Sequence, residues 1–153
     1  MTNEEANRWS GSFKTPGVFP WVTEGSDIEA YFCRADYLVA LYKVSVGIAE
    51  KWREDAAKKV IGARKTFLEK RKRVVQAVWE NGGSPNAEVL WREAGGPSPS
   101  TVTGKKLLAA LKTVIKEEKL DDSLLNLFTI PSDYTLAPEL KELIETAVVV
   151  DKI

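Results

Sequence analysis

Two short motifs in this sequence carry residue types that could act on phosphate esters. Asp27 and Glu29 stand two positions apart, and two carboxylates can hold a divalent cation such as Mg²⁺ when a turn brings them together. Lys105, far along the chain in Gly104-Lys105-Lys106, could stabilise charge that develops on a phosphate beside that metal. On a regular helix the two carboxylates would diverge by roughly 200°. Acidic side chains in a first helical turn also complement the helix dipole, which explains the pair without a metal.

The lack of histidine excludes most other catalytic sites. The chain has 153 residues, no histidine and a single cysteine, Cys33. A Ser-His-Asp or Cys-His nucleophile, a histidine-ligated metal, an internal disulfide and a multi-cysteine zinc site therefore cannot be built within it. Carboxylate–metal chemistry, a lysine-assisted reaction and binding without catalysis are what is left. Cys33 lies among Tyr31, Phe32 and Tyr37, a setting typical of a buried structural thiol.

A basic segment between residues 51 and 73 is the densest charged feature. It holds ten lysine and arginine residues against three acidic residues, a net charge of +7. Such a density of cations would attract the phosphate backbone of a nucleic acid without reading its sequence. The predicted nucleic-acid-binding residues are Lys58, Lys59, Arg64, Lys65, Lys70, Arg71, Lys72 and Arg73.

The same charges also have a structural interpretation. From residue 119 onward the chain carries seven acidic residues against three lysines, so the basic segment could be a solvated helix face that pairs with the acidic end. The overall formal charge of zero favours that alternative. Trp52 and Trp79 flank the segment and could stack on bases, although packing into the core is the simpler expectation for both.

Residues 38–52 form a weak helix-turn-helix pattern, with the turn expected near Val44 and Ser45. A true unit of this kind places its second helix in a DNA major groove. Lys43 stands where glycine is usual, and Val39 where a small alanine is usual. Helical hairpins without a DNA-binding role are common, so this pattern is the weaker of the two nucleic-acid signals.

The pattern of apolar residues predicts a mainly α fold, a compact bundle of about six or seven helices with at most a minor strand. Gly11, Pro16 and Pro20 predict an extended arm over residues 1–24, in which residues 18–22 are either an edge strand or a segment packed on helices. A single helical domain is expected over residues 25–153. Helices are expected from Ser26, after Ser45, through the basic segment to Asn81-Gly82-Gly83, after Ser84-Pro85, after Thr101 or Thr103, around 124–128, and from Pro138.

No apolar run approaches the roughly 18–20 residues that a membrane-spanning helix needs. The first twelve residues are polar and partly acidic and do not resemble a signal peptide. We therefore expect a cytoplasmic protein that makes no membrane contact.

The run from Gly25 to Phe32, followed by Tyr37-Leu38 and a lysine-rich helix, resembles the segment after the acidic core of Toprim-type domains. The similarity is to the overcoming-lysogenization-defect (OLD) nucleases and related phage or mobile-element proteins. Gly104-Lys105-Lys106-Leu107-Leu108 and the region from Pro138 to Leu143 look like the later part of that family. The resemblance touches most of the span from Trp21 to Glu145, through short and degenerate motifs.

The resemblance implies magnesium-dependent cleavage or transfer at a phosphodiester. Glu29 would match a family acidic position, Asp27 would be the neighbouring metal ligand, and Lys105 would match the later catalytic lysine. Toprim domains also need an upstream glutamate and an Asp-x-Asp pair, and this sequence contains no Asp-x-Asp. The resemblance therefore implies the helical C-terminal portion of such a protein, without its catalytic sheet and inactive alone. We expect that the chain requires no cofactor; Mg²⁺ is the ion that the resemblance implies.

Three functions from different classes are consistent with these patterns. The first is an accessory helical module of a nucleic-acid-processing protein, which binds phosphate backbone and partners a catalytic Toprim core or another protein. The second is a small phage protein that binds DNA through the hairpin near Val44 and Ser45. The third is a non-enzymatic interaction domain whose charged halves meet another copy. The density of the basic segment favours the first.

Overall fold

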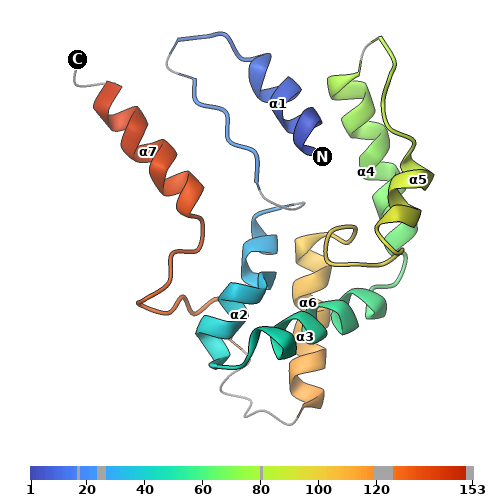
Figure 1. Ribbon diagram of the computed structural model, residues 1–153, viewed down its shortest axis with the longest axis vertical. Coiled ribbons are helices and arrows are strands. Elements are labelled where there is room, and N and C mark those ends of the chain that lie inside the picture. Colours follow the sequence, from blue (N-terminus) through green and yellow to red (C-terminus); the bar gives the residue numbers. More distant parts are fainter. Residues whose placement is uncertain (17, 24–26, 80, 119–125, 151–153) are drawn as a thin grey trace.

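The computed structural model describes residues 1–16, 18–23, 27–79, 81–118 and 126–150, the last five without side chains. Helices and irregular connections make up this described part of the chain, which contains no strand, so the predicted mainly α class is confirmed. In chain order the elements are α1 (Asn3–Gly11), the 3₁₀ helix η1 (Ile28–Cys33), α2 (Ala35–Tyr42), α3 (Val46–Lys59), α4 (Ala63–Val78), α5 (Ala87–Glu93), α6 (Gly104–Glu117) and α7 (Pro138–Val150) (Figure 1).

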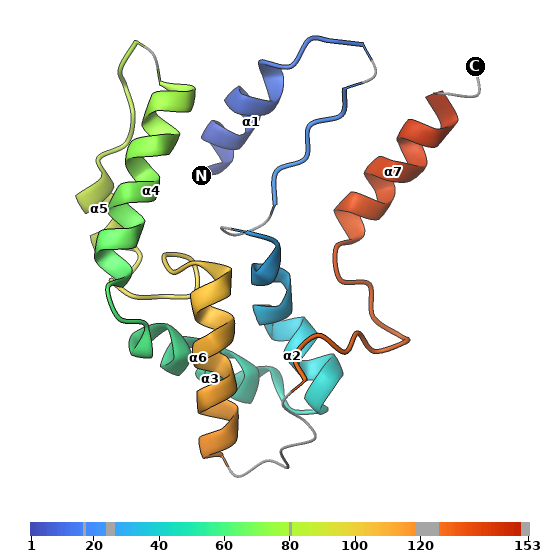
Figure 2. The same ribbon diagram turned by 180° about the vertical axis from the view of Figure 1, so that it is seen from behind.

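Helix α6 is the centre of the core. It packs against α3 and η1, and α2 packs against α3 (Figure 1, Figure 2). Apolar side chains recur on α6 at intervals of three and four residues, which gives the helix one continuous apolar face. The members of that face are buried: Leu107, Leu108, Leu111, Val114 and Ile115.

A glycine lets η1 approach the start of α6. Thr103 caps α6 by accepting a hydrogen bond from the Lys106 backbone N–H, and Gly104 follows as the first helical residue. A Cβ at position 104 would overlap Asp27 Oδ1 and the backbone of Ala30. Only glycine therefore fits this contact, which joins two segments more than seventy residues apart.

The first eleven residues differ from the prediction of an extended arm. Thr2 accepts a hydrogen bond from the Glu5 N–H, and the Glu5 carboxylate accepts one from the Thr2 N–H, a reciprocal cap that starts α1. The glycine and proline residues that predicted an extended arm begin only at Gly11, where α1 ends. The described chain after α1 continues without regular structure to Thr23, so residues 18–22 form no strand.

Other boundaries follow the sequence with small shifts. Ser45 caps α3, Thr103 caps α6 and Pro138 is the first residue of α7, as expected. Asn86, rather than Ser84, caps α5. The expected cap at Ser26 and the expected turn at 124 and 125 lie outside the described residues.

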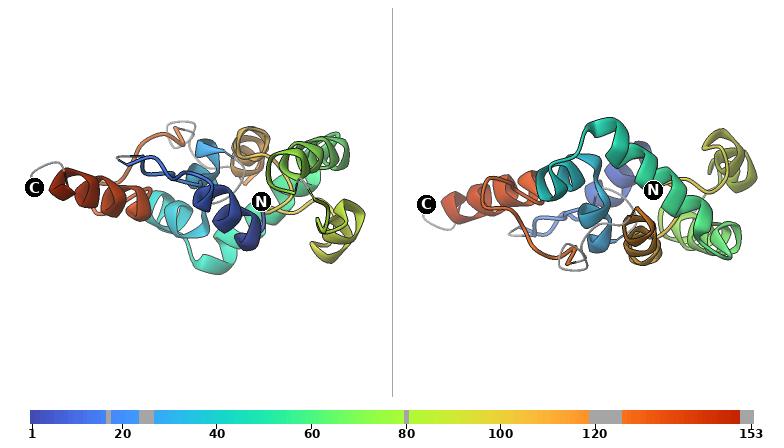
Figure 3. Two further views of the ribbon diagram at one scale, coloured as in Figure 1. Left: turned by 90° about the horizontal axis from the view of Figure 1, so that it is seen from above. Right: turned by 90° about the horizontal axis from the view of Figure 1, so that it is seen from below.

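The elements separate into two sides around the core. Helices α4 and α5 lie at one side and α7 lies at the other, with α1 between them (Figure 1, Figure 3). The hydroxyl of Tyr31 in η1 donates a hydrogen bond to Glu139 in the first turn of α7. No helix in the described part of the chain is long and apolar enough to cross a membrane.

Candidate nucleic-acid interface

The basic segment forms the second half of α3 and most of α4, and its cations have three different fates. Of its eight predicted nucleic-acid-binding residues, one is buried, four are paired with carboxylates, and three are exposed without an ion pair to a described residue. The distinction decides which of them can contact a ligand.

Arg71 is the buried cation. Its side chain is 6% exposed, and its Nη1 and Nη2 each donate to a Glu5 carboxylate oxygen at 2.7 Å. The same carboxylate accepts a hydrogen bond from Trp79 Nε1 at 2.9 Å. This network docks α1 onto α4. The guanidinium of Arg71 is therefore used inside the fold, and its assignment to nucleic-acid binding stays a prediction.

The ionisation of Glu5 reflects this network. Burial alone would raise the pKa of the carboxyl, but hydrogen bonds from Arg71, Thr2 and Trp79 and the charge of Arg71 outweigh burial and lower the pKa to about 2. Glu5 is thus a fully buried carboxylate that stays charged at neutral pH. Charge-assisted, two-pronged hydrogen bonds of this kind offset the cost of removing both ions from water.

Four predicted nucleic-acid-binding residues face acidic partners. The partners come from α3 itself, from α5 and α6, and from the residue that precedes η1. The pairs are Lys58–Asp55 at 3.7 Å, Lys59–Glu117 at 2.9 Å, Arg64–Glu88 at 2.9 Å and Lys70–Asp27 at 3.9 Å. The structural interpretation of the basic segment is therefore correct for these residues, although its acidic partners differ from the expected ones.

Lys65, Lys72 and Arg73 form no ion pair with any described residue, and all three are exposed. At 100° per residue they fall within about 100° of one another around α4. Glu69 lies on the same face. The outer face of α4 thus carries three cations against one carboxylate, a much smaller positive surface than the segment's net charge suggests.

The two motifs that could act on phosphate esters do meet in space. Gly104 packs against Asp27, and Lys105 follows in the exposed first turn of α6. Lys70 Nζ lies 3.9 Å from Asp27 Oδ2, so a cation already stands beside this carboxylate. Within the described ranges, no group of three or more histidine, cysteine, aspartate or glutamate side chains is placed to hold a metal. The proposed roles of Asp27, Glu29 and Lys105 stay predictions.

The helix-turn-helix pattern corresponds to α2 and α3, joined by residues 43–45. Lys43 adopts a left-handed conformation with φ of 54°, at the position where glycine is usual. Trp52 of α3 is 3% exposed and packs edge-on against Tyr42, so it belongs to the core and is not available to bases. The hairpin exists, and a DNA-binding role for it stays a prediction.

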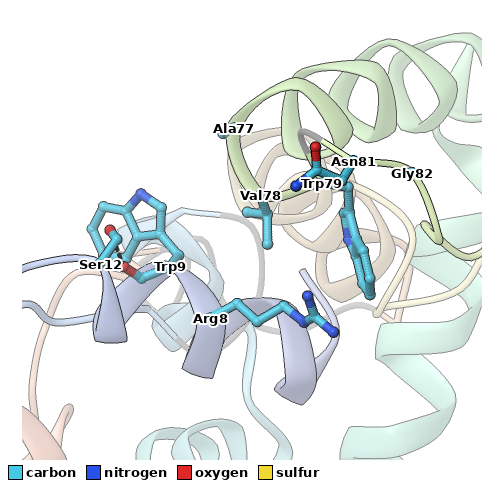
Figure 4. A pocket seen from close by; sticks show the side chains of 8 residues that line it. All are labelled: Arg8, Trp9, Ser12, Ala77, Val78, Trp79, Asn81 and Gly82. Carbon is cyan, nitrogen blue, oxygen red and sulfur yellow. Dashed lines mark hydrogen bonds between the residues drawn. The ribbon is translucent and has the colours of Figure 1, made fainter.

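A shallow hollow separates α1 from the end of α4 (Figure 4). The Arg8 guanidinium lies 4.1 Å from the centre of the Trp79 ring, and Trp9 and Val78 contribute to the walls. With the Glu5 hydrogen bond on its indole nitrogen, Trp79 is packed between α1 and α4, as expected from the sequence. The volume of the hollow is about 320 Å³.

Sequence reasoning missed Glu5, the residue that fixes α1 on α4. The signal was present as Thr2-x-x-Glu5, the spacing of a capping box. Its hydrogen bonds to Arg71 and Trp79 depend on tertiary structure and leave no local pattern.

Comparisons with protein-family models, with curated proteins and with solved structures find no significant match to this chain. They therefore neither support nor oppose the resemblance to Toprim-type and OLD proteins.

Proposed function

We propose that this protein is a helical binding module that contacts the phosphate backbone of nucleic acids through the outer face of α4. The observation that carries the proposal is the group of three exposed cations, Lys65, Lys72 and Arg73, which no described carboxylate neutralises. They lie on one face of one continuous helix, so neighbouring phosphates of a single strand or duplex can reach them together.

The size of this surface sets the strength and kind of binding. Three phosphate contacts on a duplex correspond to a slope of about −2.7 when log K is plotted against log salt concentration. Binding should therefore be modest, indifferent to base sequence and lost at high salt. Such contacts hold a backbone in place but do not read bases.

The chain offers a matched pair of variants to test the proposal. The test variant replaces Lys65, Lys72 and Arg73 with glutamine, and the control replaces Lys58, Lys59 and Arg64. Each removes two lysines and one arginine from exposed positions on α3 or α4, but only the control residues face carboxylates. Binding to a fluorescent 20-mer, single-stranded and duplex, is measured by anisotropy between 25 and 200 mM salt.

The test variant should lose most of its affinity and most of its salt dependence, while the control keeps both. Equal losses in the two variants would show that net charge, rather than this face, drives binding. A preference for one duplex sequence that survives competitor DNA would point instead to the α2–α3 hairpin. No binding by the unmodified chain would refute the proposal.

The resemblance to OLD proteins adds an expectation about context. It implies that this module works beside a catalytic core that carries the Asp-x-Asp pair missing here. Copurification with a protein that carries such a core, and magnesium-dependent cleavage only by the complex, would support that part of the proposal.

A further inference from the structure

A large cavity lies on the inner side of α4, separate from the proposed phosphate-binding face except at Arg73. Its volume is about 830 Å³, and its walls come from α1, residues 22–23, α4, residues 100–102 and the start of α7. Cavities of roughly 300–1,000 Å³ are the size that proteins use for small-molecule ligands. Nothing in the proposed function uses this space.

Most of the wall is apolar. Phe67 and Val74 stand two turns apart on one face of α4, and Ala6, Val22 and Val102 contribute apolar wall from other segments. An apolar body of some length would remove this surface from water, which is favourable in proportion to the area covered.

The polar part of the wall is basic. Lys70, Arg71 and Arg73 line the cavity within one turn of α4, against one acidic side chain, Glu139. Arg71 is 5% exposed, and its Nε is buried without a hydrogen-bond acceptor among the described residues. Because this nitrogen has no exposed surface, a ligand in the cavity does not reach it, and Arg71 contributes positive charge rather than a hydrogen bond.

The charges leave room for a single negative group. Lys70 already faces Asp27, and Arg71 already faces Glu5. Of the lysine and arginine side chains of the wall, Arg73 is the one without an ion pair to any described residue, and Glu139 would repel a multiply charged group such as a phosphate monoester.

We propose that this cavity binds a small amphipathic carboxylate, with an acyl chain against the apolar wall and the carboxylate beside Arg73. The carboxylate supplies the negative charge that Arg73 lacks. The acyl chain covers Phe67, Val74 and the apolar residues of the other segments.

The test uses decanoate below its micelle-forming concentration as the probe. Decan-1-ol has the same chain without the charge, and acetate has the charge without the chain. Binding is measured by isothermal titration and by methyl NMR shifts at Val22, Val74 and Val102, with Val46 and Ile61, exposed residues outside the cavity walls, as controls. Decanoate should bind roughly tenfold more tightly than decan-1-ol, and acetate should not bind.

Variants separate the two parts of the wall. Arg73→Gln should weaken decanoate binding about tenfold and leave decan-1-ol unchanged, whereas the neighbouring Lys72→Gln should affect neither. Val74→Trp and Ala6→Leu, which fill the cavity from α4 and from α1, should each weaken binding of both chains. Two filling variants are used so that the test still stands if one of them does not fold.

Equal binding of decanoate and decan-1-ol would overturn the basic part of the proposal, and tighter binding of adenosine monophosphate would overturn the choice of a carboxylate. Cavity methyls that respond to none of the probes would overturn the proposal altogether. Arg73 belongs to both proposed sites, so the filling variants at Val74 and Ala6, which leave Lys65, Lys72 and Arg73 in place, separate ligand binding from nucleic-acid binding.

Discussion

Replacing Glu5 with glutamine should destabilise the protein far more than its surface-like sequence context suggests. Glutamine keeps the size of the side chain and removes its charge. The Arg71 guanidinium, 6% exposed, would then be buried without a counter-ion, and the hydrogen bonds that hold α1 on α4 would be weakened.

The magnitude follows from the pKa of Glu5. The fold lowers this pKa from 4.5 to about 2. At about 1.4 kcal/mol per unit, a shift of that size means that the folded state favours the charged form by about 3 kcal/mol. Breaking a buried ion pair by removing one partner costs about 3–5 kcal/mol, which is consistent. We therefore expect Glu5→Gln to lower the free energy of unfolding by about 3 kcal/mol.

Urea unfolding at pH 7, followed by circular dichroism and by tryptophan fluorescence, measures this loss. Glu4→Gln is the matched control, because Glu4 is the next residue and also pairs with an arginine, Arg8, at 3.0 Å. Both side chains of that pair are more than half exposed, so its loss should cost about 0.5 kcal/mol or less. A difference of under about 1 kcal/mol between the variants would refute the reasoning, since it falls below the range for breaking a buried pair.

The pH dependence of stability carries the same information with a definite sign. The pKa of Glu5 is lower in the folded than in the unfolded chain, so its contribution is complete above pH 4.5 and is lost as the pH falls toward 2. The unmodified protein should lose stability across that window, and Glu5→Gln should lose correspondingly less.

Three further substitutions or reactions test other contacts. Gly104→Ala should destabilise by about 2 kcal/mol or more in thermal unfolding, because the new Cβ overlaps η1. Tyr37→Phe should cost about 1–2 kcal/mol, also in thermal unfolding, because its buried hydroxyl donates to the carbonyl oxygens of Leu127 at 2.7 Å and Thr129 at 3.0 Å. Burial raises the pKa of the Cys33 thiol to about 12, so the folded protein should not react with a thiol reagent at pH 8.

Each of these has its own control. Gly47→Ala in α3 meets nothing closer than 4.0 Å and should be neutral or slightly stabilising, so an equal loss at position 47 would contradict the overlap at position 104. For Tyr37→Phe the comparison is Tyr42→Phe, and the free energy of unfolding of each variant is measured with several probes. Cys33 should react fully once urea has unfolded the chain, and rapid reaction without urea would show that the thiol is accessible.

The helical class and several boundaries could be predicted because their causes are local. Ser45 and Thr103 carry hydroxyls that cap the helices beginning at the next residue. The spacing of the leucines in α6 predicts its buried apolar face. The missed helix α1 also had a local cause, the capping pair Thr2 and Glu5, but the later prolines and glycines outweighed it in the prediction.

The candidate site was predicted less well because charge in a sequence says nothing about pairing in space. Lys72 and Arg71 are neighbours in the chain and equally basic, yet one is exposed and the other is buried against Glu5. One residue is a rotation of 100° on a helix, which separates the solvent face from the packed face. The cavity could not be predicted from the sequence either, because its walls come from five separate segments that only the fold brings together.

The distance along the chain between Glu5 and Arg71 has a consequence for how the protein is made. The two residues are 66 positions apart, and a ribosome that adds about 5–20 residues per second needs about 3–13 s to synthesise the chain between them. For that interval the nascent α1 has left the ribosome without the helix on which it docks. Docking of α1 therefore waits until α4 has emerged, and a chaperone or protease that meets the growing chain in that interval encounters α1 undocked.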